Sequence, residues 1–295
     1  MSDYIISCCS TADLTKEQFE KYDIKYVCFH YELDGKDYVD DLGQSMDFDE
    51  FYKAMEEGSM TKTSQVNVDE YVSFFKGFLD KGLDILHLTL SSGISGTYNS
   101  AMIAKSELED EYPDRKIYVV DSLAASGGYG LLMKTLSDKR KEGMSIDDLY
   151  KWSEDNKLNL QHWFFVTELT YLIRGGRVSK TAGAVGKLLN ICPLLNVDFE
   201  GKLINRMKVR TKNKVKIETV NKMMEHVTDG ADYTGGCIIN HSACYEDARD
   251  VADLIEEKIP ALKGKVIINY IGTTIGSHTG PGTVALFFWG DKRID

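Results

Sequence analysis

Strand-like and helix-like segments alternate through the first half of this chain, and this alternation constrains the fold more than any other feature. Apolar runs at residues 4–7, 85–90 and 116–120 have the length of short buried strands, and each precedes a segment with helical character. Asn67 and Glu70 have the spacing of a capping box at the start of one such segment. Strands that alternate with helices indicate a mainly parallel sheet with helices on both faces.

The second half of the chain has a different pattern. Apolar runs on either side of the turn 200–202 predict a β-hairpin. Further strands are predicted at 161–167, 236–240, 266–270 and 283–289, with helices near 213–228 and 245–259 between them. A mixed or antiparallel sheet with helices follows from this order. We therefore divide the chain into an N-terminal α/β domain, residues 1–160, and a C-terminal α/β domain, residues 161–295.

A turn rich in serine and glycine, S-S-G-I-S-G-T-Y at 91–98, lies where a predicted strand meets a helix predicted over 95–112. A related turn, S-G-G-Y at 126–129, follows the next strand. In open α/β sheets this edge binds ligands. The first amides of a helix are unpaired and partly positive. Ser95 as N-cap with Gly96 beside it would suit an anion, because glycine allows close approach.

Two other interpretations of the serine turn remain open. The first is plain helix capping, in which Ser95 serves only the backbone. The second is nucleophilic catalysis, because residues 93–97 nearly match G-x-S-x-G, the nucleophile elbow of α/β hydrolases, and His278 lies downstream. Thr97 replaces the last glycine of that motif. A serine hydrolase that acts on lipid esters, with Ser95 as nucleophile, is therefore the alternative function.

Four further segments carry polar or small residues in patterns that permit function. A hydroxyl cluster at 61–65 precedes a predicted helix, and a glycine-rich loop predicted at 276–282 contains His278. The stretch 202–216 is basic and has no acidic residue, which fits either a soluble edge strand or a docking face for an acidic or phosphate-bearing partner. The segment 174–186 fails the phosphate-loop test. Its small residues, Ala182, Gly183 and Gly186, fit close packing or contact with an apolar ligand.

Composition excludes several classes of protein. The formal net charge of −11 argues against a nucleic-acid partner. No apolar run approaches the roughly 20 residues of a membrane span, and the N-terminus does not have the pattern of a signal peptide. We therefore expect a cytoplasmic protein without stable membrane insertion. The six cysteines form no C-x-x-C pair, and His241 with Cys244 is a weak metal signal, so we expect free thiols, no metal and no cofactor.

Taken together, these segments resemble the DegV family, the fatty-acid-binding subunits of bacterial fatty acid kinase. The resemblance is carried by T-S-Q at 63–65, S-S-G-I-S-G-T-Y at 91–98, D-S-x-x-x-S at 121–126, Y-L-I-R-G-G-R-V-S at 171–179, R-x-K-x-R at 206–210 and G-S-H-T-G-P-G at 276–282. It departs from the family pattern at Val66, where proline is frequent, and at Cys9, where an aspartate is usual.

The resemblance implies a two-domain α/β protein with one long-chain fatty acid between the domains. It implies that Thr63 and Ser95 hold the carboxylate, that the Gly96 amide is a further donor, and that His278 lies near the head group. The resemblance further implies a protein that is not itself an enzyme. Such a protein would present the carboxyl group to a separate ATP-dependent fatty acid kinase, which makes acyl phosphate for phospholipid synthesis.

The resemblance also bears on the basic residues. It makes Arg174, Arg206 and Arg210 candidates for kinase docking or phosphate handling. The serine turn itself contains no lysine or arginine. We therefore expect neutral hydroxyls and helix amides to hold the carboxylate and to leave an oxygen available for attack on ATP.

Overall fold

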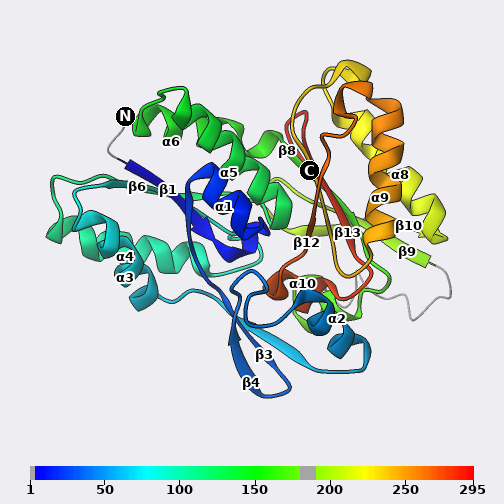
Figure 1. Ribbon diagram of the computed structural model, residues 1–295, viewed down its shortest axis with the longest axis horizontal. Coiled ribbons are helices and arrows are strands. Elements are labelled where there is room, and N and C mark those ends of the chain that lie inside the picture. Colours follow the sequence, from blue (N-terminus) through cyan, green and yellow to red (C-terminus); the bar gives the residue numbers. More distant parts are fainter. Residues whose placement is uncertain (1–3, 180–190) are drawn as a thin grey trace.

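The computed structural model describes residues 4–179 and 191–295. Its first sheet is parallel throughout and has the order β2-β1-β6-β7 (Figure 1). The strands are β1 (Tyr4–Cys9), β2 (Ile24–Val27), β6 (Asp84–Thr89) and β7 (Ile117–Asp121). This sheet confirms the parallel arrangement predicted for the N-terminal half.

Helices cover both faces of the parallel sheet, as the alternating pattern predicts. On one face, α3 (Val68–Leu79) and α4 (Thr97–Glu111) pack on strand residues such as Ile5 and Ile85. On the other face, α1 (Lys16–Tyr22), α5 (Ser126–Lys141) and α6 (Ile146–Asn156) pack on Ile6, Leu86 and Leu88. The α3 helix begins with the predicted capping box between Asn67 and Glu70.

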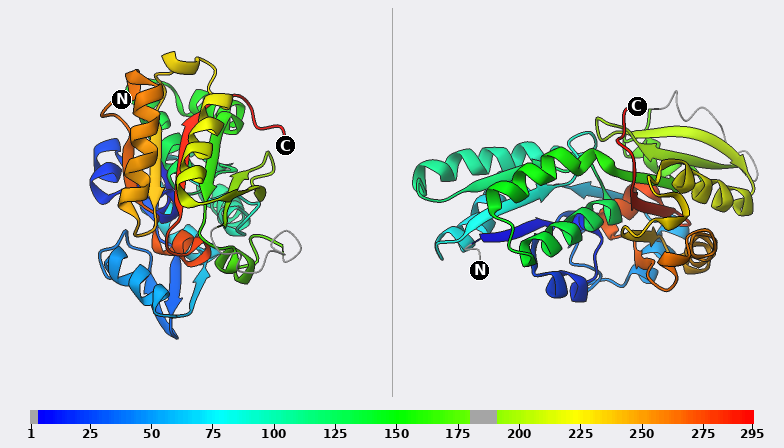
Figure 2. Two further views of the ribbon diagram at one scale, coloured as in Figure 1. Left: turned by 90° about the vertical axis from the view of Figure 1, so that its right-hand side faces the viewer. Right: turned by 90° about the horizontal axis from the view of Figure 1, so that it is seen from above.

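The second large sheet is mixed and has the order β10-β9-β8-β13-β11-β12. Its strands are β8 (Leu160–Phe165), β9 (Ile191–Val197), β10 (Leu203–Arg210), β11 (Cys237–His241), β12 (Ile267–Tyr270) and β13 (Val284–Trp289). Only β11 and β12 pair in parallel. Helices α8 (Lys212–His226) and α9 (Tyr245–Lys258) cover one face, and they stand side by side in front of the strands in the left view of Figure 2. Short 3-10 helices lie at Ser10–Ala12, Lys157–Asn159, Gly230–Asp232 and Pro260–Leu262.

The α5 helix packs against both large sheets. Its apolar residues share one core with Leu88 of the parallel sheet and with Phe164 and Phe287 of the mixed sheet. Two glycines in its first turn allow this close approach, because a Cβ at Gly127 or Gly128 would stand only 2.1 or 2.3 Å from side chains of the mixed sheet. The division at residue 160 stays a prediction, and one hydrophobic core contains residues from both sides of it.

A third sheet was not foreseen from the sequence. It is antiparallel, with the order β4 (Lys36–Val39), β3 (His30–Leu33) and β5 (Thr61–Ser64), and α2 (Phe48–Glu56) packs on it. The hydroxyl cluster before α3 is thus a strand. It is short and all four of its residues are polar, so it has no apolar pattern from which a strand could be recognised.

Two predicted boundaries were wrong. The helix predicted over 95–112 begins at Thr97 with Gly96 as its N-cap, so Ser95 precedes the cap. The predicted loop 276–282 is largely helical, because α10 spans Thr273–Thr279. Packing overrides weak helix propensity there: Gly276 lies so close to the buried Tyr52 that a Cβ would stand 2.3 Å from the Tyr52 hydroxyl. A further short helix, α7 (Thr170–Arg174), lies against α10.

Candidate functional site

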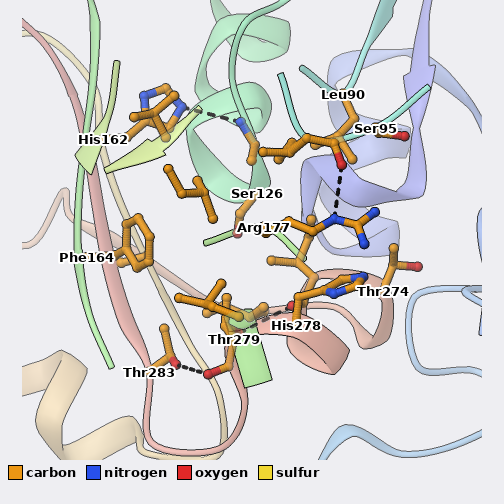
Figure 3. A pocket seen from close by; sticks show the side chains of 18 of the residues that line it. Leu90, Ser95, Ser126, His162, Phe164, Arg177, Thr274, His278, Thr279 and Thr283 are labelled. Atoms are coloured by element: carbon orange, nitrogen blue, oxygen red, sulfur yellow. Dashed lines mark hydrogen bonds between the residues drawn. The ribbon is translucent and has the colours of Figure 1, made fainter. Parts of the chain in front are cut away.

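A cavity opens at the carboxyl ends of the parallel strands, the edge that the sequence predicts for a ligand (Figure 3). The end of β6, the start of α5, the strands β8 and β13, and the helix α10 all contribute to its walls. The space left empty between its walls is about 720 Å³, including the part open to solvent. Its apolar lining consists of Phe29, Leu90, Ile94, Ala125, Phe164, Leu172, Val197, Leu203, Ile271, Ile275, Ala285 and Phe287.

Thr63 and His278 meet at the cavity although they are far apart in sequence. Thr63 comes from β5 and His278 from α10, and the distance from Thr63 Oγ1 to His278 Nε2 is 2.8 Å. The ring is tightly enclosed, since a Cβ at Gly175 would stand 2.1 Å from His278 Nδ1. That nitrogen has no hydrogen-bond partner in the part of the chain that the structure describes. Burial, with the charges of Arg177 and Arg174, lowers the pKa of His278 to about 4, so the ring is neutral at pH 7.

Ser95 lines the same cavity, one residue before the cap of α4. Its Oγ accepts a hydrogen bond from the Thr97 amide at 3.2 Å. Gly96 lies against the Gln65 side chain, since a Cβ at Gly96 would stand 2.8 Å from Gln65 Oε1. Gln65 also donates to Ser100 Oγ at 3.0 Å, which ties the end of β5 to the first turn of α4. The T-S-Q and S-G-T-Y motifs are therefore in direct contact.

The other serines of the turn have structural partners. Ser91 is buried and donates to the carbonyl of Gly201 at 2.8 Å, in the turn between β9 and β10. The contact is close, because a Cβ at Gly201 would stand 2.0 Å from Ser91 Oγ. Ser92 donates its backbone amide to Asp121 Oδ1 at 3.1 Å. Of the serines in this turn, only Ser95 lines the cavity, and the turn also anchors the β9–β10 hairpin beside it.

Arg177 is a charged cavity residue that the sequence analysis did not assign to the site. Its Nε donates to the Ile94 carbonyl at 3.1 Å and its Nη1 to the Gly175 carbonyl at 2.6 Å. Within residues 4–179 and 191–295, no acidic side chain forms an ion pair with it. Burial lowers its pKa, yet a guanidinium remains charged at pH 7. The sequence signal that could have identified it is the motif R-G-G-R at 174–177, in which a cationic residue stands on each side of two glycines.

The other predicted basic residues lie outside the cavity. Arg174 is exposed, with Nη1 3.2 Å from Met60 Sδ. Arg206 donates to Asn196 Oδ1 at 2.8 Å and pairs with Asp295 at 3.3 Å, while Arg210 is exposed at the end of β10. The basic stretch is an edge strand followed by a helix. Two of its lysines, Lys212 and Lys216, pair with Asp247.

The remaining sequence signals have the following outcomes. The small residues Ala182, Gly183 and Gly186 lie outside the described residues. His241 accepts from the Cys244 amide at 3.3 Å, and no group of three potential metal ligands gathers within the described ranges. In that same part of the chain no hydrogen bond joins Ser95 to His278, whose Nε2 contacts Thr63. No described helix is long and apolar enough to cross a membrane.

Comparison with known proteins gives a consistent result. The DegV family of uncharacterised proteins matches residues 6–291. A DegV domain-containing protein from Clostridium perfringens is 41% identical over 293 residues, covering 99% of both chains. A protein from Thermotoga maritima named as a fatty acid-binding protein is 33% identical over 284 residues, covering 93% of both chains.

Solved structures extend this similarity to the whole fold. A DegV lipid-binding protein from Thermotoga maritima superposes with a TM-score of 0.86 at 30% identity, covering 100% of both chains. The Fatty Acid Kinase (Fak) B3 protein of Streptococcus pneumoniae, solved with linoleic acid, has a TM-score of 0.82 at 23% identity, covering 99% of this chain and 100% of that one. At 23% identity, the comparison with the Fak B3 protein supports similarity of fold alone.

Proposed function

This chain belongs to the DegV family, and from that premise we propose that it binds a long-chain fatty acid in the cavity and presents the carboxylate to a separate ATP-dependent fatty acid kinase. One observation carries the proposal: Thr63, Ser95, His278 and Arg177 line a cavity whose other walls are mostly apolar. A ligand with one anionic head and a long apolar tail matches this division.

The tail supplies most of the affinity in this proposal. Burying an acyl chain of about 16 carbons contributes roughly 12 kcal/mol before costs, at about 0.8 kcal/mol per methylene. Ordering the chain and losing overall motion offset several kcal/mol of this. Hydrogen bonds from charged or hydroxyl groups add about 1.5–3 kcal/mol each and fix the orientation of the head group.

The direction of the Thr63–His278 hydrogen bond follows from proton counting. A threonine hydroxyl has one proton. If Thr63 donates that proton to the carboxylate, it must accept from His278, so the Nε2 of the neutral ring carries the hydrogen. Nδ1 is then a bare lone pair enclosed beside Gly175. In this arrangement His278 positions the Thr63 hydroxyl, and Thr63 contacts the ligand.

Arg177 modifies the expectation that only neutral groups surround the carboxylate. Its guanidinium comes from a segment far from the serine turn in sequence, and two of its nitrogens are bound to backbone carbonyls. Those bonds hold the group at the cavity wall, and among the residues that the structure describes nothing bonds to Nη2, so that nitrogen can donate to an anion. A carboxylate beside Arg177 would be held by charge as well as by the hydroxyls of Thr63 and Ser95.

A surface groove adjoins the head-group end and supports presentation to a partner. It is lined by residues 93–94, 175–179 and 202–205 and shares Ile94, Arg177 and Leu203 with the cavity. A carboxylate held near Arg177 would therefore lie next to an open surface, where a kinase could bring ATP. Arg174, Arg206 and Arg210 remain proposals for partner contact.

The first experiment is mass spectrometry of an organic extract from the natively purified protein. We expect near-stoichiometric free fatty acid. A lipid-free protein that also fails to take up added fatty acid would contradict the proposal.

Labelling of Ser95 by a fluorophosphonate probe, lost on heat denaturation, would favour the hydrolase instead. Presentation is tested separately, by asking whether a kinase catalytic subunit forms acyl phosphate from ATP only when lipid-loaded protein is added.

A further inference from the structure

A second pocket lies on the face of the mixed sheet opposite the cavity. Trp163 of β8 lines this outer pocket, whereas its neighbours His162 and Phe164 line the cavity, because successive side chains of a strand point to opposite faces. Strands β8, β9 and β10, helix α8 and residues 291–295 form its walls, and it shares no lining residue with the cavity. The proposed fatty-acid site therefore does not use it.

Two buried N–H groups of the outer pocket lack an acceptor. Trp163 is 5% exposed and Arg293 is 4% exposed, and both line the pocket. Neither Trp163 Nε1 nor Arg293 Nε has a hydrogen-bond partner in the part of the chain that the structure describes. Both groups can only donate. A buried donor without a partner is costly, so two of them in one pocket indicate an acceptor that comes from outside the protein.

Asn196 adds a third donor beside Trp163. The two residues are directly opposite each other in the β8–β9 pair, so their side chains lie next to each other on one face. Asn196 Oδ1 accepts from Arg206 Nε at 2.8 Å, which sets the orientation of the amide and leaves Nδ2 to donate elsewhere. A row of donors thus crosses β8, β9 and β10, from Trp163 to Arg206.

Arg293 is a buried cation that forms no ion pair within residues 4–179 and 191–295. Its Nη1 donates to the Asp198 carbonyl at 2.8 Å and its Nη2 to the Leu123 carbonyl at 2.9 Å. Burial lowers the pKa of Arg293 to about 10, so the guanidinium stays charged at pH 7. Backbone carbonyls satisfy its hydrogen bonds but carry no net charge. Because buried charges in proteins are usually paired, this one favours an anion nearby.

The charged residues of the lining are more basic than acidic. Four fixed cations and two carboxylates line the outer pocket, namely Arg206, Lys222, Lys292, Arg293, Asp291 and Asp295. Asp291 is bound by Gln161 and His226, and Asp295 pairs with Arg206 at 3.3 Å. Lys222 also pairs with Glu225 outside the lining. In a chain with a net charge of −11, this local balance distinguishes the pocket from the rest of the surface.

We propose that the outer pocket binds phosphate, either as the free ion or as the phosphate group of a small monoester. A phosphate dianion has oxygens that accept in several directions, so it can meet donors from β8, β9 and the C-terminal residues together. A carboxylate has two oxygens in one plane and would reach fewer of these donors. The inference does not depend on the proposed fatty-acid function, since the two pockets lie on opposite faces of the sheet.

The test is a phosphate titration of the ¹⁵N-labelled full chain, followed by the indole N–H signals. The chain has three tryptophans, so Trp152 and Trp289 are internal references. We expect inorganic phosphate to move the Trp163 signal downfield until it saturates, while the other two signals stay in place. Acetate at the same ionic strength should bind at least about tenfold more weakly. No saturable movement with phosphate, or equal binding of acetate, would overturn the proposal.

Methyl phosphate distinguishes the two sources of the ligand. If it binds about as tightly as inorganic phosphate, the pocket accepts phosphate groups that belong to larger molecules. If only inorganic phosphate saturates the Trp163 signal, the pocket is a site for the free ion. Either result supports phosphate as the ligand class.

Arg206→Gln and Lys208→Gln form a matched pair of variants. Each removes one positive charge from β10, but Arg206 lines the outer pocket and Lys208 is exposed outside it. We expect phosphate affinity to fall about tenfold in Arg206→Gln and less than about twofold in Lys208→Gln. Equal losses would show attraction to overall charge and would contradict a defined site.

Asn196→Asp is a sharper test of the donor row. It keeps the shape of the side chain but replaces the Nδ2 donor with a carboxylate oxygen, which repels phosphate, so binding should be lost. Phosphate binding that persists unchanged in a folded Asn196→Asp variant would contradict the assignment. If the variant does not fold, the titration of the unmodified chain still decides the proposal.

Discussion

A single hydroxyl proton decides what Thr63 can do in the cavity. Thr63 Oγ1 lies 2.8 Å from a neutral imidazole, and only one orientation of that hydrogen bond leaves its proton for a ligand. The T-S-Q motif predicted the residue, but its direction of donation depends on a histidine from the other end of the chain. Whether Thr63 can donate to a ligand therefore depends on whether His278 Nε2 carries a proton.

Thr63→Val removes that proton and keeps the shape of the side chain. We expect fatty-acid affinity to fall about tenfold, the effect of one hydrogen bond to a charged group. Thr63→Ser keeps the hydroxyl and should bind nearly as well as the unmodified protein. Isothermal titration with palmitate measures both. Equal losses for valine and serine would mean that side-chain shape, rather than the hydroxyl, matters at this position.

Arg177 and Arg174 form a natural pair for comparison. Arg177→Gln removes a charge from the cavity wall, and we expect palmitate affinity to fall tenfold or more, consistent with about 1.5–3 kcal/mol for a charge-assisted bond. Arg174→Gln changes an exposed residue and should leave lipid affinity unchanged.

NMR titration of His278 gives a second measure of the Arg177 change. Arg177 is one cause of the lowered pKa of His278, so that pKa should rise above about 4 in Arg177→Gln while burial keeps it below the ordinary value. An unchanged pKa would show that the guanidinium does not act on the ring.

At the scale of elements, α5 does the most to join the molecule. Its first turn meets the cavity, and its glycines approach the mixed sheet while the opposite side of the helix packs on the parallel sheet. The S-G-G-Y motif was interpreted from sequence as an echo of the serine turn. Its glycines serve packing between helix and sheet, and its serine reaches the cavity.

Gly128→Ala tests that contact. The new Cβ would stand 2.3 Å from His162 Nε2 and 2.8 Å from Phe287, so we expect the free energy of unfolding to fall by about 1–3 kcal/mol, as for other overpacked cores. Gly77→Ala in α3 is the control, because apart from its own helix backbone no atom lies within 4 Å of a Cβ built there. That variant should gain up to about 1 kcal/mol from helix propensity. Urea denaturation measures both, and equal effects would contradict the close contact.

At the scale of the whole molecule, buried polar groups link the two halves. The backbone carbonyl of Asp13 accepts from Asn240 at 3.2 Å and from Asn269 at 3.3 Å, and its side chain accepts from Ser126. Asp13 follows the first strand, and both asparagines belong to the mixed sheet. These bonds complement the contact between Ser91 and the β9–β10 hairpin.

Asp13 makes stability depend on pH in a direction that can be tested. Burial, and next the charge of Asp40, raise its pKa well above the ordinary value. The folded protein therefore binds more protons than the unfolded chain, and this contribution to stability falls as pH rises from about 3.9 towards the raised pKa. In Asp13→Asn that fall should be absent. The pKa of His278 is lowered, so its contribution to stability rises with pH up to about pH 6.5, opposite to that of Asp13. Because this second contribution is common to both proteins, the quantity to measure is the difference in the free energy of unfolding between Asp13→Asn and the unmodified protein.

The ligand should stabilise the molecule as a whole. A fatty acid present at about 100 times its Kd adds about 2.7 kcal/mol to the free energy of unfolding. For a chain of this size each kcal/mol raises Tm by roughly 2–4 °C, so delipidated protein should melt several degrees lower and recover on adding palmitate. The methyl ester of palmitate, which lacks the negative charge, should restore less. Equal recovery with acid and ester would argue against a carboxylate site.

Local patterns were sufficient for much of this protein. Apolar runs and capping boxes predicted the parallel sheet, the helices on both faces and the β9–β10 hairpin, because strand and helix periodicity is written in neighbouring residues. Thr63, Ser95 and His278 all line the cavity, and each stands in a motif that carries the resemblance to the DegV family, while their contact with a carboxylate stays a prediction. The net charge was likewise fixed by composition.

Only the tertiary structure decided the rest. The antiparallel sheet of β4, β3 and β5 has short, polar strands, and α10 forms from weak helix formers, so packing rather than propensity determines both. Arg177 reaches the cavity while Arg206 and Arg210 do not, because the chain path after α7 and along β10 is set by contacts between distant segments. Sequence fixes what each residue can do, and long-range packing decides which residues meet.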